Sequence, residues 1–120
     1  MVVYCARNRA DWSATVAAYH VPGYVVAFAY IGLPRVWLSP SICAGVTGAD
    51  PWAVLVFLHE LSHTEGIRSE RRANCRALER ERPFLERFLG LSPEQAQSVY
   101  EQSLARALAE PPRYRPVACD

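Results

Sequence analysis

The chain has 120 residues, the length of one domain, so residues 1–120 are expected to form a single folding unit. Apolar residues make up 51% of it and charged residues 21%, which is typical of a soluble globular protein. A formal net charge of +1 argues against strong general attraction to nucleic acid or to an anionic membrane surface.

The chain contains no apolar run long enough for a membrane span, which needs about 20 consecutive apolar residues. The most apolar runs, YVVAFAYIGL and WAVLVFL, have the length of core segments. The start, MVVYCARNRADW, lacks a basic segment followed by a long apolar one, so we expect no signal peptide. This predicts a protein that is not exported, or one whose targeting segment precedes Met1.

The first forty residues predict one helix and two strands. Apolar residues recur at helical spacing within residues 9–20, so a short helix is expected there, ending at VPG. Residues 24–32 are rich in β-branched and aromatic side chains between two glycines, which is typical of a strand. Residues 35–40 (RVWLSP) predict a second, shorter strand, and the two strands can form an antiparallel pair.

The strongest helix signals lie between Asp50 and Gly66. Asp50 is a good N-cap, Pro51 suits the first helical turn, and Gly66 is a good stop. Apolar side chains occur on nearly every side of this helix, namely Trp52, Val54, Leu55, Val56, Phe57, Leu58 and Leu61. A helix that is apolar all round is a buried helix, so it should lie at the centre of a small core.

Two more helices are expected after Gly66. Ser69 can cap a helix of about residues 70–81, which Pro83 should interrupt. Ser92 begins another helix with an apolar face, and residues 111–120 predict an extended tail. The whole pattern predicts an α+β fold, mostly helical, with a short antiparallel β-sheet and a central buried helix.

The predicted central helix contains HELSH, which fits the pattern H-E-x-x-H. His59 and His63 are four residues apart, so both rings lie on one face of the helix and can bind one Zn²⁺ at about 2.0–2.1 Å. Glu60 follows His59 by about 100° of rotation, and can act as general base on a zinc-bound water without binding the metal. Two imidazoles and a carboxylate inside an apolar helix are costly without a partner, which favours a metal over histidines that only bond to backbone.

HELSH on a buried helix, followed by an acidic residue, resembles the zincin superfamily of metallopeptidases. The segments WLSPSIC and HELSHTEGIRSERRANCRA, within residues 36–78, resemble small uncharacterised bacterial proteins of zincin type. The resemblance implies a minimal single-domain zincin with a zinc cofactor. It also implies hydrolysis of amide bonds in a peptide or protein substrate, with Glu60 as the catalytic base.

The H-E-x-x-H motif supplies two zinc ligands and does not include the third. Metzincins carry a histidine at the position of Ser69, a poor ligand, whereas gluzincins use a glutamate from a separate helix. Gly66 lets the chain turn back, which favours Glu70 at the start of the next helix. ERRAN, which begins at Glu70, resembles the glutamate-x-x-alanine-acid segment of gluzincins, with asparagine in the last place. The alternatives are Glu65, His20, Asp50, and either Cys43 or Cys75.

The four cysteines form no C-x-x-C pair, which argues against a structural zinc knuckle. Two disulfides are predicted, Cys5–Cys119 between the termini and Cys43–Cys75 next to the motif. Disulfides would weakly favour an extracytoplasmic location, in tension with the missing signal peptide. The alternative is four buried reduced thiols.

Arginines recur every four residues after Gly66, at Arg68, Arg72, Arg76 and Arg80. Because glutamates are interleaved, a solvated mixed-charge face is favoured over a phosphate-binding face, and a nucleic-acid partner is disfavoured. Tyr100 and Tyr114 are candidate donors to a developing oxyanion, with a core position favoured for Tyr100. A non-catalytic, zinc-stabilised binding module remains the alternative function, because 120 residues leave little material for a substrate cleft.

Overall fold

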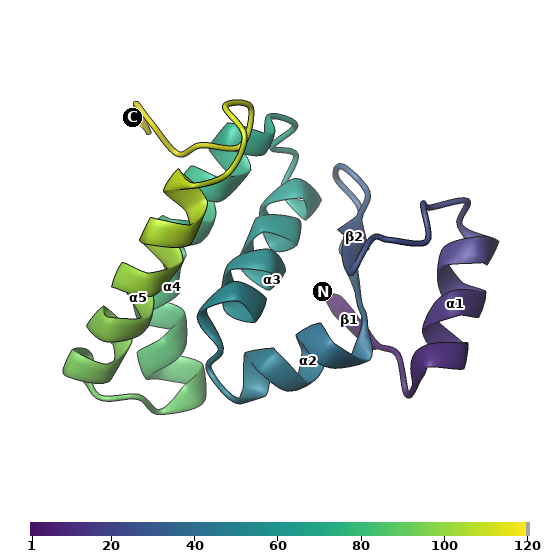
Figure 1. The fold of residues 1–120 in the computed structure, drawn as a ribbon, viewed down its shortest axis with the longest axis horizontal. Helices are drawn as coiled ribbons and strands as arrows, with labels where there is room; N and C mark the ends of the chain where they lie inside the picture. The colour runs from purple at the N-terminus through teal and green to yellow at the C-terminus, as the bar shows by residue number, and fades with distance from the viewer. Residues whose placement is uncertain (120) are drawn as a thin grey trace.

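The computed structural model describes residues 1–119, which form five helices and a three-stranded sheet (Figure 1). The elements are, in chain order, β1 (Val2–Cys5), α1 (Arg9–Ala18), β2 (Ala27–Ala29), β3 (Arg35–Leu38), α2 (Pro40–Thr47), α3 (Pro51–Thr64), α4 (Glu70–Leu89) and α5 (Pro93–Leu108). Figure 1 shows α1 on one side of the sheet and α3, α4 and α5 on the other. The predicted class, α+β with a helical majority, is confirmed.

The sheet is mixed, because its central strand β3 pairs parallel with β1 and antiparallel with β2. Val3 lies opposite Val36 in the first pair, and Phe28 lies opposite Trp37 in the second. The expected antiparallel pair of strands is present as β2 and β3, but the short antiparallel sheet is not, because the additional strand β1 pairs parallel with β3 and makes the sheet mixed. Strand β1 was not predicted because its residues are mostly exposed and show no alternation of polar and apolar side chains.

Successive side chains of β3 point to opposite faces of the sheet and join two cores. Trp37 stacks on Phe28, with ring centroids 4.9 Å apart, in a cluster with Trp12 of α1. Val36 and Leu38 are buried on the other face, in a cluster that includes residues of α2 and α3. The sheet thereby connects α1 to the helical part of the domain.

Helix α3 is the buried central helix that its capping residues and its apolar side chains predicted. The Asp50 carboxylate caps it by accepting a hydrogen bond from the Ala53 N–H at 3.0 Å. Val54, Leu55 and Leu58 are nearly inaccessible to solvent and pack in one cluster with residues of α4 and α5. Within residues 1–119 no single helix is long and apolar enough to cross a membrane. Helices α2 and α3 pass that test only together, and they are bent by 107°.

Helix α4 begins with Ser69 as its N-cap, as predicted, but continues through Pro83 instead of breaking there. Proline in a helix removes one backbone hydrogen bond and crowds a carbonyl, at a cost of about 3 kcal/mol. The turns after Pro83 carry Leu85, which is fully buried in the main core, and this burial offsets the cost. Helix α2 was also missed: the strand expected over residues 35–40 ends at Leu38, and a helix starts at Pro40.

Two disulfides are present, Cys5–Cys43 and Cys75–Cys119, with Cα–Cα distances of 5.8 and 5.4 Å. The predicted pairs, Cys5–Cys119 and Cys43–Cys75, are wrong. The reason is topological: β1 pairs with β3, which leads directly into α2, and this places Cys5 beside Cys43. The C-terminal segment instead returns to α4, far from the N-terminus in Figure 1.

Candidate metal centre

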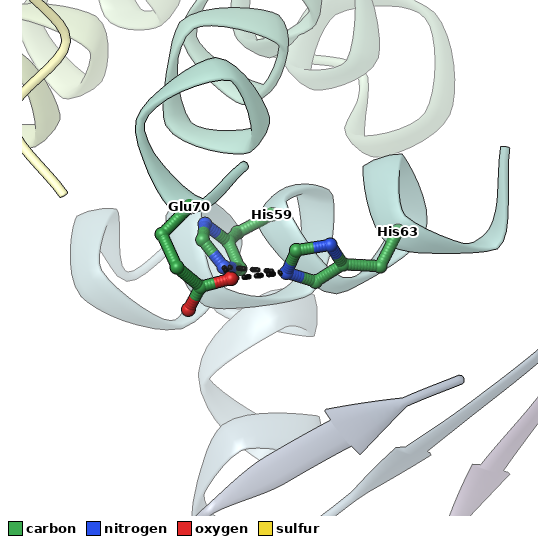
Figure 2. Close-up of side chains that lie close together, drawn as sticks. All are labelled: His59, His63 and Glu70. Carbon is green, nitrogen blue, oxygen red and sulfur yellow. Dashed lines mark hydrogen bonds and ion pairs between the residues drawn. The ribbon is translucent and has the colours of Figure 1, made fainter. Parts of the chain in front are cut away.

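The side chains of His59, His63 and Glu70 meet between the second half of α3 and the first turn of α4 (Figure 2). His63 Nε2 lies 2.7 Å from Glu70 Oε1 and 3.1 Å from His59 Nε2, and His59 Nε2 lies 3.6 Å from the same carboxylate oxygen. Ligand atoms of a tetrahedral metal ion with bonds of about 2.0–2.2 Å are about 3.4 Å apart. The three spacings bracket this value, so this group can hold a metal ion.

The local backbone explains why a glutamate in the next helix reaches the histidines. Helix α3 ends in a turn in which the Gly66 N–H donates to the His63 carbonyl at 3.0 Å. Gly66 has a φ of +97°, a conformation that side-chain-bearing residues rarely adopt. The chain reverses there, Ser69 accepts a hydrogen bond from the Arg72 N–H, and Glu70 starts α4 facing the two rings. The predicted role of Gly66 in this reversal is confirmed.

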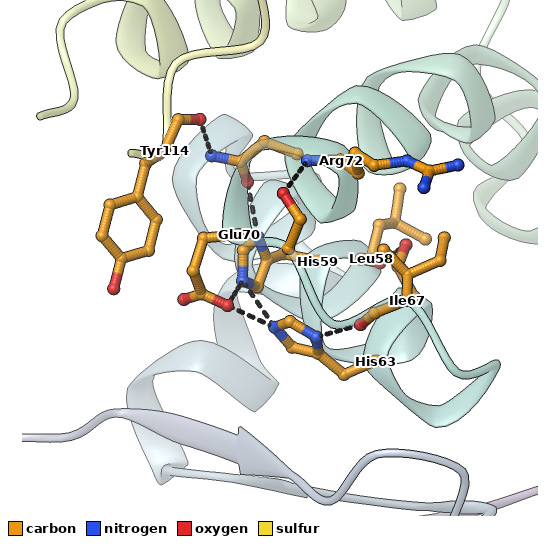
Figure 3. A network of polar contacts seen from close by, with 10 residues as sticks. Leu58, His59, His63, Ile67, Glu70, Arg72 and Tyr114 are labelled. Atoms are coloured by element: carbon orange, nitrogen blue, oxygen red, sulfur yellow. Dashed lines mark hydrogen bonds and ion pairs between the residues drawn. The ribbon is translucent and has the colours of Figure 1, made fainter. Parts of the chain in front are cut away.

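A second layer of hydrogen bonds orients both rings (Figure 3). His59 Nδ1 lies 2.6 Å from Asn74 Oδ1, and His63 Nδ1 lies 2.6 Å from the Ile67 carbonyl oxygen. Because both partners are oxygen acceptors, each ring keeps a proton on Nδ1 and directs Nε2 toward the shared point. The Asn74 amide is itself oriented, since its Nδ2 donates to the Tyr114 carbonyl at 2.8 Å.

The charges of the three side chains are strongly coupled. Hydrogen bonds from His59 and His63 hold the pKa of Glu70 well below its usual range. The Glu70 carboxylate in turn raises the pKa of His63, against the opposing effect of burial. The group therefore favours a positive charge between its atoms, which can be a proton on an imidazole or a metal ion.

Glu60 follows His59 on α3 and lies outside the group of three converging ligands. Burial raises the pKa of Glu60 to about 7, although the neighbouring histidines and the backbone of Ala29 in β2 act in the opposite direction. A carboxyl group with a pKa near neutrality can both take up and release a proton at physiological pH.

The alternative third ligands lie elsewhere in the described part of the chain. Glu65 is exposed and pairs with Arg80, and Asp50 caps the far end of α3. His20 is exposed after α1, and Cys43 and Cys75 are each held in a disulfide. None of these side chains joins the ligand group formed within residues 1–119.

The two candidate tyrosines have different surroundings. Tyr100 packs at the edge of the main core, with the Arg82 guanidinium 4.4 Å from its ring centroid. Tyr114 lies beside the three converging side chains, with its ring centroid 6.3 Å from that of His59. Burial and the Glu70 carboxylate raise the pKa of Tyr114, so its hydroxyl stays protonated and can donate a hydrogen bond.

Several arginines of α4 have acidic or carbonyl partners. Arg76 pairs with Glu79 at 2.9 Å, and Arg80 pairs with Glu65. Arg71 donates from one guanidinium nitrogen to two carbonyl groups of the C-terminal segment. These contacts agree with the mixed-charge face expected from the interleaved glutamates.

Sequence patterns did not assign a role to Asn74 or to the backbone of Tyr114. The only signal was the asparagine that ends ERRAN, the place of an acid in the gluzincin segment. The Tyr114 carbonyl is 40 residues away from Asn74 in the chain, and only the fold brings the two together. Comparisons with models of protein families, with curated proteins and with solved structures found no match to this chain.

Proposed function

We propose that this protein is a zinc-dependent, metallopeptidase-like hydrolase that cleaves amide bonds of a peptide or protein substrate. One observation carries the proposal: His59 Nε2, His63 Nε2 and Glu70 Oε1 converge on one point. Glu60, with a pKa near neutrality, lies beside them on the same helix. This is the combination of two ligands and a base that the H-E-x-x-H pattern supplies to metallopeptidases.

The donor set favours zinc. Two imidazole nitrogens and one carboxylate oxygen are a common protein ligand set for catalytic zinc, which leaves one coordination position for water or substrate. Both histidines present Nε2 as a lone-pair donor because Asn74 and Ile67 hold their Nδ1 protons. Zinc at this point would supply a Lewis acid and lower the pKa of a bound water toward neutrality.

Side chains of the protein would then transfer the protons and stabilise the developing negative charge. A cation at the ligand group favours the ionised form of Glu60, which is the form that accepts a proton. Glu60 takes a proton from the attacking water and delivers it to the leaving amine. The Tyr114 hydroxyl, which lies on the Glu70 side of the centre, donates to the carbonyl oxygen as negative charge develops on it.

The sheet offers a place for an extended substrate. Strand β2 is an edge of the sheet and packs against α3, and the backbone of its residue Ala29 faces Glu60. A peptide that adds to this edge by backbone hydrogen bonds would pass the ligand group. The two disulfides weakly favour an oxidising, extracytoplasmic compartment for this activity.

A non-catalytic metal-stabilised binding module is the second candidate. The observation that favours it is that the ligands come from α3 and α4, which pack against each other, so a metal would cross-link the two helices. Structural metal sites contribute folding free energy in this way. Such a module would need the ligands but would not need Glu60.

The deciding experiment compares Glu60→Gln with the parent and with Glu65→Gln, a control at an exposed glutamate on the same segment. All three proteins are loaded with one equivalent of zinc and tested on a library of quenched fluorescent peptides. The hydrolase proposal predicts cleavage by the parent and Glu65→Gln, and zinc binding without cleavage by Glu60→Gln. If the zinc-loaded parent cleaves no peptide, or if Glu60→Gln cleaves equally well, the hydrolase proposal is wrong.

A further inference from the structure

The C-terminal segment, residues 110–119, follows α5 and runs back to the beginning of α4 (Figure 1). Its end is tied to α4 by the disulfide Cys75–Cys119. It is also held by Arg71, whose Nη1 donates to the Val117 carbonyl at 2.6 Å and to the Ala118 carbonyl at 2.8 Å. All these tethers attach the segment to the first turns of the helix that carries Glu70.

The same segment supports the metal centre through its backbone. Its Tyr114 carbonyl accepts the hydrogen bond from Asn74 Nδ2, and Asn74 Oδ1 faces His59 Nδ1 (Figure 3). Asn74 immediately precedes Cys75 in α4. A short path of contacts therefore leads from the disulfide through the segment to a metal-facing histidine.

Few apolar contacts hold the segment in place. Pro116 is the only residue of 110–119 that is buried, and Val117 is 53% exposed. Burial of apolar surface contributes about 25 cal/mol per Å², so a mostly exposed segment gains little from it. Segments with few buried apolar contacts open locally at a low cost in free energy. The bridge is thus a main constraint that keeps the Tyr114 carbonyl beside Asn74.

The surroundings of this disulfide favour its reduction. Cys119 is exposed, and both cysteines line a small hollow whose charged residues are three arginines, Arg71, Arg72 and Arg76, and one glutamate, Glu79, so its net charge is positive. Positive groups stabilise the thiolate that leaves when a disulfide is attacked. A more stable leaving thiolate departs faster in thiol–disulfide exchange.

We propose that the Cys75–Cys119 disulfide controls metal affinity: the closed bridge holds residues 110–119 in the position that orients Asn74 and His59, and its reduction weakens metal binding. The reductant is a dithiol. Its thiolate attacks Cys119 Sγ, the S–S bond breaks, and Cys75 leaves as a thiolate that takes up a proton. The second thiol then displaces Cys119 as a thiol, so two electrons and two protons pass to the protein and the reductant becomes a disulfide.

The expected consequence follows from the hydrogen-bond chemistry of Asn74. Without the Tyr114 carbonyl, the Asn74 amide can turn and present its NH₂ group to His59 Nδ1. His59 then keeps its proton on Nε2, the atom that would bind the metal. Loss of a partner that orients a metal-binding histidine typically weakens metal binding by about 10–100-fold. This inference rests on the proposed metal centre but not on peptide hydrolysis.

The second disulfide provides a matched control. Cys5–Cys43 joins β1 to α2. Neither cysteine belongs to the group of three proposed ligands, and neither is next to a histidine in the sequence. The experiment compares the double variant Cys75→Ser/Cys119→Ser with Cys5→Ser/Cys43→Ser. Zinc affinity is measured by competition with a chromophoric chelator, and far-UV circular dichroism and thermal unfolding of the metal-free proteins establish that each variant is folded.

A redox arm uses the Cys5→Ser/Cys43→Ser protein, which retains only the C-terminal bridge. It is reduced with a phosphine, freed of reductant under anaerobic conditions, titrated with zinc and then reoxidised. We expect a 10–100-fold loss of affinity in Cys75→Ser/Cys119→Ser and a reversible loss of similar size on reduction. We expect less than a threefold change in Cys5→Ser/Cys43→Ser when its bridge is closed.

Three outcomes would overturn the inference. Equal zinc affinity in the proteins with and without the Cys75–Cys119 bridge would overturn only this inference, and the proposed function would not be affected. Tighter binding on reduction, as expected if a freed thiolate binds the metal, would also overturn it. Absence of zinc binding in every form would remove the metal centre, and with it both the proposed function and this inference.

Discussion

The Nε2 atoms of His59 and His63 lie 3.1 Å apart, and one oxygen of Glu70 lies within 3.6 Å of both. Two neutral rings that keep their protons on Nδ1 would face each other with lone pairs, which is unfavourable unless a positive charge lies between them. The Glu70 carboxylate raises the pKa of His63, which favours a proton at this place in the metal-free protein. A divalent metal would supply more charge to the same three atoms.

Zinc should therefore stabilise the folded protein. A ligand that binds only the folded state at 100 times its dissociation constant adds about 2.7 kcal/mol to the free energy of unfolding. We expect micromolar zinc to raise the melting temperature by several degrees and chelation to reverse the change. His63→Ala should lose this response, whereas His20→Ala, at an exposed histidine, should keep it. Equal responses in the two variants would place the metal elsewhere.

Glu70→Ala should weaken zinc binding far more than Glu65→Ala. Glu70 offers a carboxylate oxygen 2.7 Å from His63 Nε2, whereas Glu65 is exposed and pairs with Arg80. We expect a loss of more than about 100-fold for Glu70→Ala, since changes beyond the direct ligands typically cost 10–100-fold. Glu65→Ala should stay within about threefold of the parent. Competition with a chelator measures both, and similar affinities for the two variants would show that Glu70 is not a ligand.

Tyr114→Phe should reduce hydrolysis while leaving zinc affinity unchanged. The backbone carbonyl that orients Asn74 is retained in this variant, and only the hydroxyl near Glu70 is lost. Removal of one oxyanion donor typically lowers kcat by about 10²–10³-fold. Tyr100→Phe is the control, because Tyr100 packs against the main core under Arg82. A fall in zinc affinity without a fall in kcat would assign Tyr114 a structural role instead.

Glu81 should make stability depend on pH. This α4 carboxyl is fully buried, and neither of its oxygens has a hydrogen-bond partner among the described residues. Burial raises the pKa of Glu81 to about 7. The folded state therefore binds the proton more tightly than the unfolded state. The stabilising contribution is complete below the unfolded value of 4.5 and is lost as the pH rises through 7.

Glu81→Gln should remove this dependence, because the amide has the shape of the protonated acid and carries no charge. At pH 8 the metal-free variant should exceed the parent in free energy of unfolding by roughly 1–3 kcal/mol. At pH 4, below the unfolded value, the difference should be close to zero. Glu79→Gln, on the same helix but exposed, controls for general charge effects. Urea unfolding measures these values, and a parent–variant difference that does not change with pH would contradict the raised pKa.

Local signals predicted the central part of the fold well. Asp50, Pro51 and Gly66 mark the bounds of α3 through capping and backbone preferences, which act within a few residues. The side chains of His59 and His63 lie on the same face of α3 because the two residues are four positions apart on this helix. The position of Glu70 was predictable because one glycine reversal separates the two helices.

Features that depend on distant partners were not predictable. Strand β1 is ordered by pairing with β3, and α4 continues past Pro83 because Leu85 is buried against other helices. The disulfide pairs follow from the parallel β1–β3 pairing and from the return of the C-terminal segment, neither of which leaves a local pattern. The link from Tyr114 through Asn74 to His59 depends on that same return.

The central claim is that one metal ion binds between α3 and α4 through three side chains. Crystals grown with one equivalent of zinc, and measured on both sides of the zinc absorption edge, test it most directly. We expect one strong anomalous peak about 2.0–2.2 Å from His59 Nε2, His63 Nε2 and a carboxylate oxygen of Glu70. A zinc peak that lacks any of these three ligands, or no peak near the HELSH helix, would contradict the account.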